Sequence, residues 1–101
     1  MITKYINTYP FEFYETCEAC PEQYDVYLEG KLVGYVRLRW AGLSACYPNY
    51  EGDQVYSHQW YDEKGQDGYL GQFPDDEQRN FHLEKIAQSL YNRINESETV
   101  R

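Results

Sequence analysis

The sequence predicts an α+β domain: an antiparallel sheet of four to five strands with one C-terminal helix packed on one face. Two patterns carry this prediction. Several short segments before residue 62 alternate apolar and polar side chains with a period of two, which is typical of strands with one buried face. Residues 75–95 repeat apolar side chains at spacings of three and four, which is typical of an amphipathic helix. Because the strands precede the helix without any strand–helix–strand unit, a parallel sheet is not expected.

The length of 101 residues suits one domain, expected over residues 1–95, with residues 96–101 as a flexible tail. Leu, Ile and Val are sparse, whereas 12 Tyr, 4 Phe and 2 Trp supply much of the apolar area. A tyrosine buries its ring and keeps its hydroxyl in water, so it suits half-exposed sheet faces and binding surfaces.

The first strand is expected in residues 9–16, where two phenylalanines flank an acidic residue. The clearest element follows, a hairpin whose arms are residues 24–28 and 31–40. The dipeptide Glu29-Gly30 joins these arms, and its glycine can take the positive φ that a tight hairpin turn demands.

The second arm of the hairpin has two different faces. One face holds Gly34, Val36, Leu38 and Trp40, and the other holds Val33, Tyr35, Arg37 and Arg39. A period of two with cations on one side indicates a half-buried antiparallel strand. These few cations make a poor phosphate-binding surface in a chain of net charge −8, so direct nucleic-acid binding is not expected.

Two further strands are expected before the helix. Gly42 permits the next turn, and residues 43–47 alternate as a strand that Pro48 ends, because proline has no N–H to donate to a ladder. Residues 54–61 alternate again as the last strand. Residues 62–73 are rich in glycine and acids, so they are expected to form a long polar connection.

The start of the helix is marked by a capping box. The Asp75 carboxylate can accept the N–H three residues on, and the Gln78 side chain can reach back to the cap. Asp76 and Glu77 place negative charge at the positive end of the helix dipole. The helix is expected to fray near Asn95.

The apolar stripe of the helix should cover the sheet. Phe81 falls roughly opposite this stripe, and His82 lies off it and is expected to be solvated. The predicted core consists of Val26, Leu28, Val36, Leu38, Trp40, Leu83, Ile86, Leu90 and Ile94.

Cys17 and Cys20, separated by two residues, form the one motif with the spacing of a metal or redox site. A zinc ion takes four ligands, so a zinc-binding module would have to add Cys46 and His58. A second pair at matching spacing is missing, which favours cysteines of a reduced protein and no cofactor, with the zinc module as the alternative function.

No catalytic constellation is visible, so the chain is not expected to be an enzyme. His58 shares a strand face with Tyr56 and Trp60, but no nucleophile and orienting group accompany it in a recognisable spacing. The glycines of residues 62–73 do not follow the pattern of a phosphate-binding loop.

The negative charge is concentrated in two segments. Residues 1–30 hold six acids and one base, and residues 51–77 hold eight acids and one base. Such a field attracts basic partners and repels nucleic acid. We therefore expect the segment 51–77 to be the main contact region for a basic protein, although a solvated connection is the alternative. The predicted partner-binding residues are Glu51, Asp53, Tyr56, Trp60, Tyr61, Asp62, Glu63, Asp67 and Tyr69.

No stretch is long and apolar enough to cross a bilayer, which takes about 20 such residues, and no secretory signal is visible at the start of the chain. These features predict a cytoplasmic protein without membrane contact. They leave the oligomeric state open.

Residues 20–39, CPEQYDVYLEGKLVGYVRLR, resemble short acidic proteins encoded by phages and other mobile elements. The resemblance lies in a CPEQYDVYL hairpin arm that leads into a GY-x-R-x-R strand. Small acidic phage proteins of this kind include inhibitors of host defence, such as anti-CRISPR and anti-restriction proteins. The resemblance implies a non-enzymatic inhibitor or adaptor whose partner is a basic host protein, for example a CRISPR effector or another nuclease.

Overall fold

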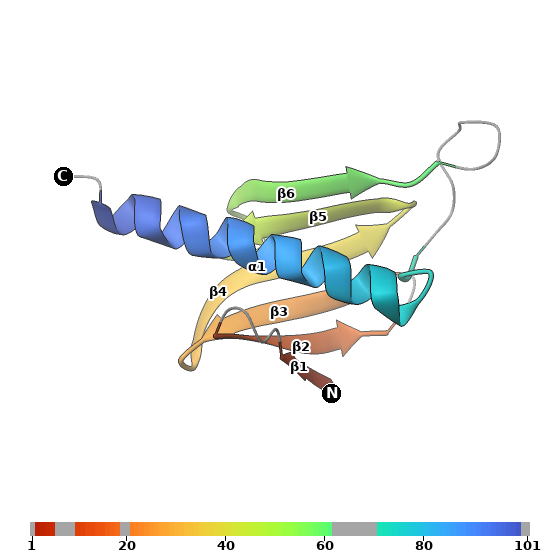
Figure 1. Cartoon of the computed structure of the whole chain (residues 1–101), viewed down its shortest axis with the longest axis horizontal. Helices are drawn as coiled ribbons and strands as arrows, with labels where there is room; N and C mark the ends of the chain where they lie inside the picture. Colours follow the sequence, from red (N-terminus) through yellow and green to blue (C-terminus); the bar gives the residue numbers. More distant parts are fainter. Residues whose placement is uncertain (1, 6–9, 19–20, 62–70, 100–101) are drawn as a thin grey trace.

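The computed structural model describes residues 2–5, 10–18, 21–61 and 71–99 of the chain. Six strands form one antiparallel sheet in the order β1-β2-β3-β4-β5-β6, and helix α1 crosses one face of it (Figure 1). The elements are β1 (Ile2–Tyr5), β2 (Phe11–Cys17), β3 (Glu22–Leu28), β4 (Lys31–Arg39), β5 (Gly42–Tyr47), β6 (Asp53–Gln59) and α1 (Asp76–Thr99). The predicted α+β class, with an antiparallel sheet and a helix on one face, is confirmed.

Each strand pairs with the strand next to it in the sequence, so the sheet is a meander. The edge strand β1 is an element that the sequence pattern does not indicate, and it pairs with β2 so that Ile2 lies opposite Glu15. At the other end of the chain, α1 continues to Thr99 rather than ending near Asn95. Neither glycine nor proline occurs between Asn95 and Thr99 to stop the helix.

The predicted β3–β4 hairpin is present. Its turn residues Glu29 and Gly30 have φ values of 52° and 82°, as a two-residue turn with two left-handed residues requires. The β4–β5 turn is formed in the same way by Trp40 and Ala41, with φ values of 55° and 58°, whereas Gly42 is already the first residue of β5.

Trp40, predicted as a core residue, lies in this second turn instead. Trp40 is 57% exposed, because a residue in the turn no longer follows the inward alternation of β4. A register shift in the β3–β4 pairing also changes the faces of β4, so that Val33 is buried next to Gly34 instead of sharing the outer face with Tyr35.

The core lies between α1 and the inner face of the sheet. The helix buries Leu83, Ile86, Ala87 and Leu90, and the sheet contributes Phe11, Phe13, Tyr24, Val26, Val36, Leu38, Leu43 and Ala45. Leu28 and Ile94, also predicted as core, are partly buried at its edge. The helix passes over β4 at Gly34, where a Cβ added to the glycine would lie only 3.0 Å from Leu90 Cδ1.

One of the two predicted capping hydrogen bonds is present at the start of α1. The Gln78 backbone N–H donates to Asp75 Oδ1 at 2.7 Å. The Gln78 side chain does not reach back to the cap, because its Oε1 accepts the indole N–H of Trp60 at 2.9 Å instead. Helix α1 is the one helix among the described residues. It lacks the apolar stretch that a bilayer crossing would need.

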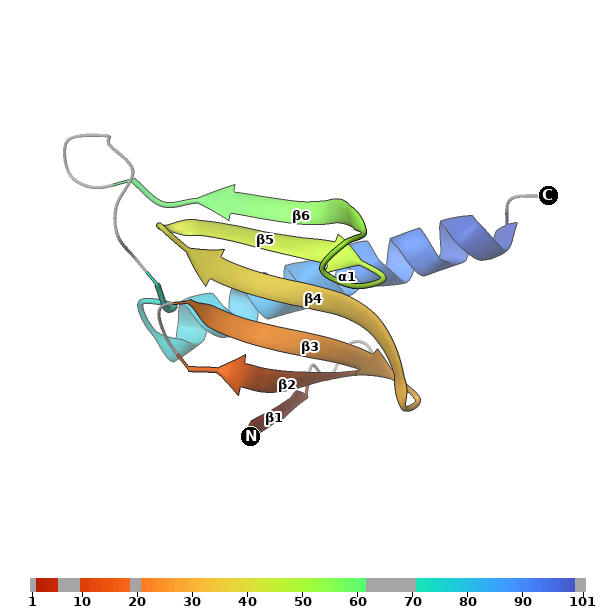
Figure 2. The ribbon, with the colours of Figure 1, turned by 180° about the vertical axis from the view of Figure 1, so that it is seen from behind.

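The outer face of the sheet carries no other described element. Figure 2 views this face directly, with α1 visible only behind the strands. The tyrosines of β2, β3 and β4 on this face, Tyr14, Tyr27 and Tyr35, are half-buried.

Candidate partner-binding site

The predicted contact residues lie at two ends of β6. Glu51 is exposed in the β5–β6 turn, and Asp53 begins β6, where its Oδ2 accepts Arg93 Nη2 at 2.8 Å. Tyr61, 63% exposed, follows the other end of the strand. A strand of seven residues is roughly 23 Å long, so the two groups of predicted contact residues are separated by about that distance.

Tyr56 and Trp60 belong to the inner face and are partly buried against the core. The Tyr56 hydroxyl is 2.8 Å from His82 Nδ1, and the Trp60 indole N–H is bonded to Gln78. Their polar groups therefore hold β6 to the helix rather than facing solvent. The remaining predicted contact residues lie outside the described residues: Asp62, Glu63, Asp67 and Tyr69.

The zinc set suggested by the sequence does not come together. Cys17 in β2 and Cys46 in β5 lie three strands apart, roughly 14 Å, whereas zinc–sulfur bonds are about 2.3 Å long. His58 lies opposite Leu43 on the inner face, while Cys46 is on the outer face opposite Tyr35. Cys20 lies outside the described residues. Among those residues that are described, no group of three metal-ligating side chains is present.

His82 is buried, contrary to the expectation that it is solvated. Its ring lies between Trp60, which directly follows β6, and Phe73 of the segment before α1, at 5.0 Å and 6.1 Å between centroids. Burial, with a smaller effect of the charge of His58, lowers the pKa of His82 below its ordinary value. His82 therefore remains neutral near pH 7, with Nδ1 bonded to the Tyr56 hydroxyl.

The His82 ring borders an open hollow on one side of the helix start. We call it the histidine hollow; it measures about 510 Å³. It is lined by Tyr56, His58, Asp75, Glu77, Gln78, Phe81 and His82. Phe81 is 55% exposed, as expected for a residue opposite the apolar stripe.

A second open groove lies on the other side of the helix start, and we call it the carboxylate groove. It measures about 540 Å³ and lies between the β2–β3 connection and the first turn of α1. Its lining consists of Glu15, Glu18, Glu22, Gln72, Phe73, Pro74, Asp75, Asp76 and Arg79. Asp75, the helix cap, belongs to both the groove and the histidine hollow.

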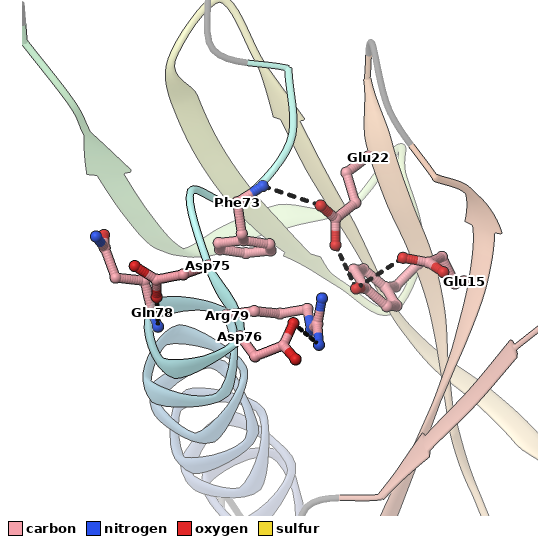
Figure 3. Close-up of polar contacts among 8 residues, drawn as sticks. Glu15, Glu22, Phe73, Asp75, Asp76, Gln78 and Arg79 are labelled. Atoms are coloured by element: carbon pink, nitrogen blue, oxygen red, sulfur yellow. Dashed lines mark hydrogen bonds and ion pairs between the residues drawn. The ribbon is translucent and has the colours of Figure 1, made fainter.

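Figure 3 shows how the floor of the groove is built around Glu22. One Glu22 carboxylate oxygen, Oε1, accepts the backbone N–H of Phe73 at 2.9 Å, and the other accepts the Tyr24 hydroxyl. The same hydroxyl is 3.1 Å from Glu15 Oε2. Glu22 N–H in turn donates to the Gly71 carbonyl at 2.7 Å, so this one residue joins the segment before α1 to β3.

Burial sets the protonation behaviour of this network. It raises the pKa of Glu22, although the hydrogen bonds from Tyr24 and from the Phe73 N–H act in the opposite direction. Burial and the neighbouring carboxylates also raise the pKa of Tyr24 far above its ordinary value, so its hydroxyl stays protonated and donates. Glu15 and Glu22 thus share the Tyr24 hydroxyl as a hydrogen-bond donor.

The groove contains a single basic side chain among its described lining, Arg79. Its Nη2 donates to Asp76 Oδ1 at 2.6 Å, an i,i+3 pair on the first turns of α1 (Figure 3). The Arg79 Nε is buried without a hydrogen-bond partner. The carboxylates of β2, β3 and the helix start therefore outnumber the cations here.

Exposed aromatic side chains lie at this same end of the sheet. Glu22 of the groove lies in line across the strands with Leu38, Leu43 and His58, next to the β4–β5 turn. That turn carries Trp40, and the backbone N–H of Trp60 donates to the adjacent Ala41 carbonyl at 2.9 Å. The sequence holds a signal for the buried acid of β3, because Glu22 alternates in phase with Tyr24 and Val26.

Comparisons of the chain with protein-family models, with curated proteins and with solved structures found no match.

Proposed function

We propose that this protein is a non-enzymatic inhibitor or adaptor that binds a basic, nucleic-acid-handling host protein through the carboxylate groove. The observation that carries the proposal is the composition of the groove: acids from β2, β3 and the start of α1 surround one arginine, itself paired with Asp76. A protein surface that binds DNA or RNA is rich in Lys and Arg, and such a surface is complementary to this groove.

The end of the molecule around the groove also offers anchors for binding. Protein interfaces obtain most of their affinity from a few large side chains such as Trp, Tyr and Arg. Trp40 and Tyr61 are both more than half exposed and flank the β4–β5 turn end of the sheet. Charge complementarity would speed the encounter, and these rings would supply contact area.

The class of partner follows from the resemblance of residues 20–39 to short acidic proteins of phages and mobile elements. Such proteins include inhibitors of host defence, and the nucleases of host defence bind their nucleic acids through basic surfaces. A CRISPR effector or a restriction nuclease is therefore the partner that we propose, bound without direct contact of this protein with nucleic acid.

The test measures DNA cleavage by a panel of purified CRISPR effectors and restriction endonucleases with increasing amounts of this protein. We expect inhibition of at least one nuclease that weakens as the salt is raised from roughly 50 to 300 mM, because surface charge pairs are screened. The groove double variant Glu18→Lys/Asp76→Lys should inhibit at least about tenfold less well, as the loss of a charge pair predicts.

The matched control is Glu51→Lys/Glu77→Lys. It changes the net charge equally and also reverses one acid in the first turn of α1, but neither residue lines the groove. If the control loses inhibition and the groove variant keeps it, the contact surface is elsewhere. If no nuclease is inhibited or bound even at low salt, the proposed function is wrong.

A further inference from the structure

Two tyrosines and two carboxylates form a square on the outer face of the sheet, where β2 pairs with β3. In the register of these strands Glu12 lies opposite Tyr27, and Tyr14 lies opposite Asp25. Each tyrosine therefore faces an acid across the strands, with the two rings on one diagonal and the two carboxylates on the other. This is the face that Figure 2 shows without a helix across it.

The square surrounds a small open hollow, which we call the outer-face hollow. Its volume is about 270 Å³, and Gly30 of the β3–β4 turn completes its lining. The Tyr14 and Tyr27 rings stand nearly perpendicular, at 86°, with centroids 5.2 Å apart. Beside Gly30, where a side chain would stand, the space is open. Since small-molecule pockets start at about 300 Å³, this hollow suits a single side chain.

The chemistry of the lining selects a cation. The face of a tyrosine ring attracts a cation within about 6 Å, and a carboxylate accepts charge-assisted hydrogen bonds. The four side chains are half-buried, so part of each remains accessible from solvent. Asp25 takes part in neither of the two ion pairs found among the described residues.

We infer that the outer-face hollow receives an arginine side chain of a basic partner protein. A guanidinium is planar, so it can stack on one tyrosine ring while its N–H fork donates to a carboxylate, whereas a lysine ammonium is a point charge that does not combine the two. The identity of the partner rests on the proposed function. The chemistry of the hollow does not, because it can be tested with isolated amino-acid derivatives.

The test is a titration of the ¹⁵N-labelled protein with N-acetyl-arginine methylamide, followed by amide chemical shifts at constant ionic strength. The lysine derivative and the uncharged citrulline derivative are titrated in parallel. We expect saturating shifts at the amides of Asp25, Tyr27 and Gly30 with arginine, weaker binding of lysine, and no saturation with citrulline. Asp25→Asn should weaken arginine binding about tenfold, the usual loss for one charge-assisted hydrogen bond.

Tyr27→Leu should also weaken arginine binding, and Tyr27→Phe should retain it, because the ring and not the hydroxyl binds the cation. Glu51→Gln is the control for loss of one exposed acid elsewhere. Non-saturating shifts with all three derivatives, or unchanged binding in the folded Asp25→Asn protein, would overturn the inference. Nuclease inhibition that Asp25→Asn does not weaken would overturn the claim that an arginine of this partner enters the hollow, whereas arginine binding without any nuclease partner would overturn only the proposed function.

Discussion

The contact between α1 and β4 can be tested by a pair of substitutions at Gly34 and Leu90. Leu90 is 1% exposed, and a Cβ on Gly34 would lie 3.0 Å and 3.2 Å from its two methyl carbons. Leu90→Ala removes these methyl groups from the core, which should lower the free energy of unfolding by about 2–5 kcal/mol.

Gly34→Ala should have different consequences in the two backgrounds. In the wild type, crowding against Leu90 costs about 1 kcal/mol, and the lower chain entropy of alanine in a strand offsets this by about 0.5–1 kcal/mol, so the net change is near zero. In the Leu90→Ala background the crowding is gone and the new methyl group fills part of the cavity, which contributes about 0.8 kcal/mol. The coupling between the two sites should therefore be about 1–2 kcal/mol.

The measurement is urea unfolding followed by tryptophan fluorescence and circular dichroism for the wild type, both single variants and the double variant. Phe81→Ala combined with Gly34→Ala is the control, since Phe81 lies on the exposed side of α1 and its effect should add within about 0.5 kcal/mol. Additive effects of Gly34 and Leu90, or a loss below about 1 kcal/mol for Leu90→Ala, would refute this packing of the helix on the sheet.

Two further predictions concern the β5–β6 turn and the groove. Gly52→Ala should lower the thermal midpoint, because the new Cβ would lie 1.9 Å from the Tyr47 carbonyl oxygen. The backbone must shift to relieve this contact, at a cost of about 1–3 kcal/mol. The neighbouring substitution Glu51→Ala is the control and should change stability by less than about 0.5 kcal/mol. Burial raises the pKa of Glu22 above its ordinary value of 4.5, so the folded protein binds this proton more tightly than the unfolded chain, and the contribution of Glu22 to stability falls as the pH rises from 4.5 through the raised pKa. Glu22→Gln removes this titration, so the stability of the variant relative to wild type should rise with pH across that window. The measurement is urea unfolding of both proteins at each pH. A relative stability that falls with pH would contradict the argument.

The sheet and helix can be predicted from the sequence where local pattern and tertiary packing agree. The Glu29-Gly30 turn and the stripe that contains Leu83 and Leu90 are such cases, because turn chemistry and periodicity depend on neighbouring residues alone. The alternation of β4 wrongly predicts that Trp40 is buried, because Trp40 and Ala41 form the turn in the left-handed conformation. These residue types seldom take that conformation, so the local sequence indicates a turn at Gly42 instead.

The candidate site is harder to predict because it joins segments far apart in the sequence. His82 lies at the edge of the helical stripe, and its burial depends on Trp60 and Phe73, which the helix pattern does not include. The link between Glu22 and the Phe73 N–H spans 51 residues, and no local pattern indicates such a pairing. Acid content alone predicts that a basic partner should be sought, but not which acids share a surface.

The order of elements along the chain has a consequence for how the protein is made. Strands β1 to β6 precede α1, so a ribosome releases this meander before the element that covers its inner face. Until α1 arrives, Phe11, Phe13 and Val26 belong to an uncovered apolar surface, which favours association between nascent chains. Each strand meets a neighbour in sequence, so sheet pairing itself can proceed early, and docking of α1 is the event that ends this exposure.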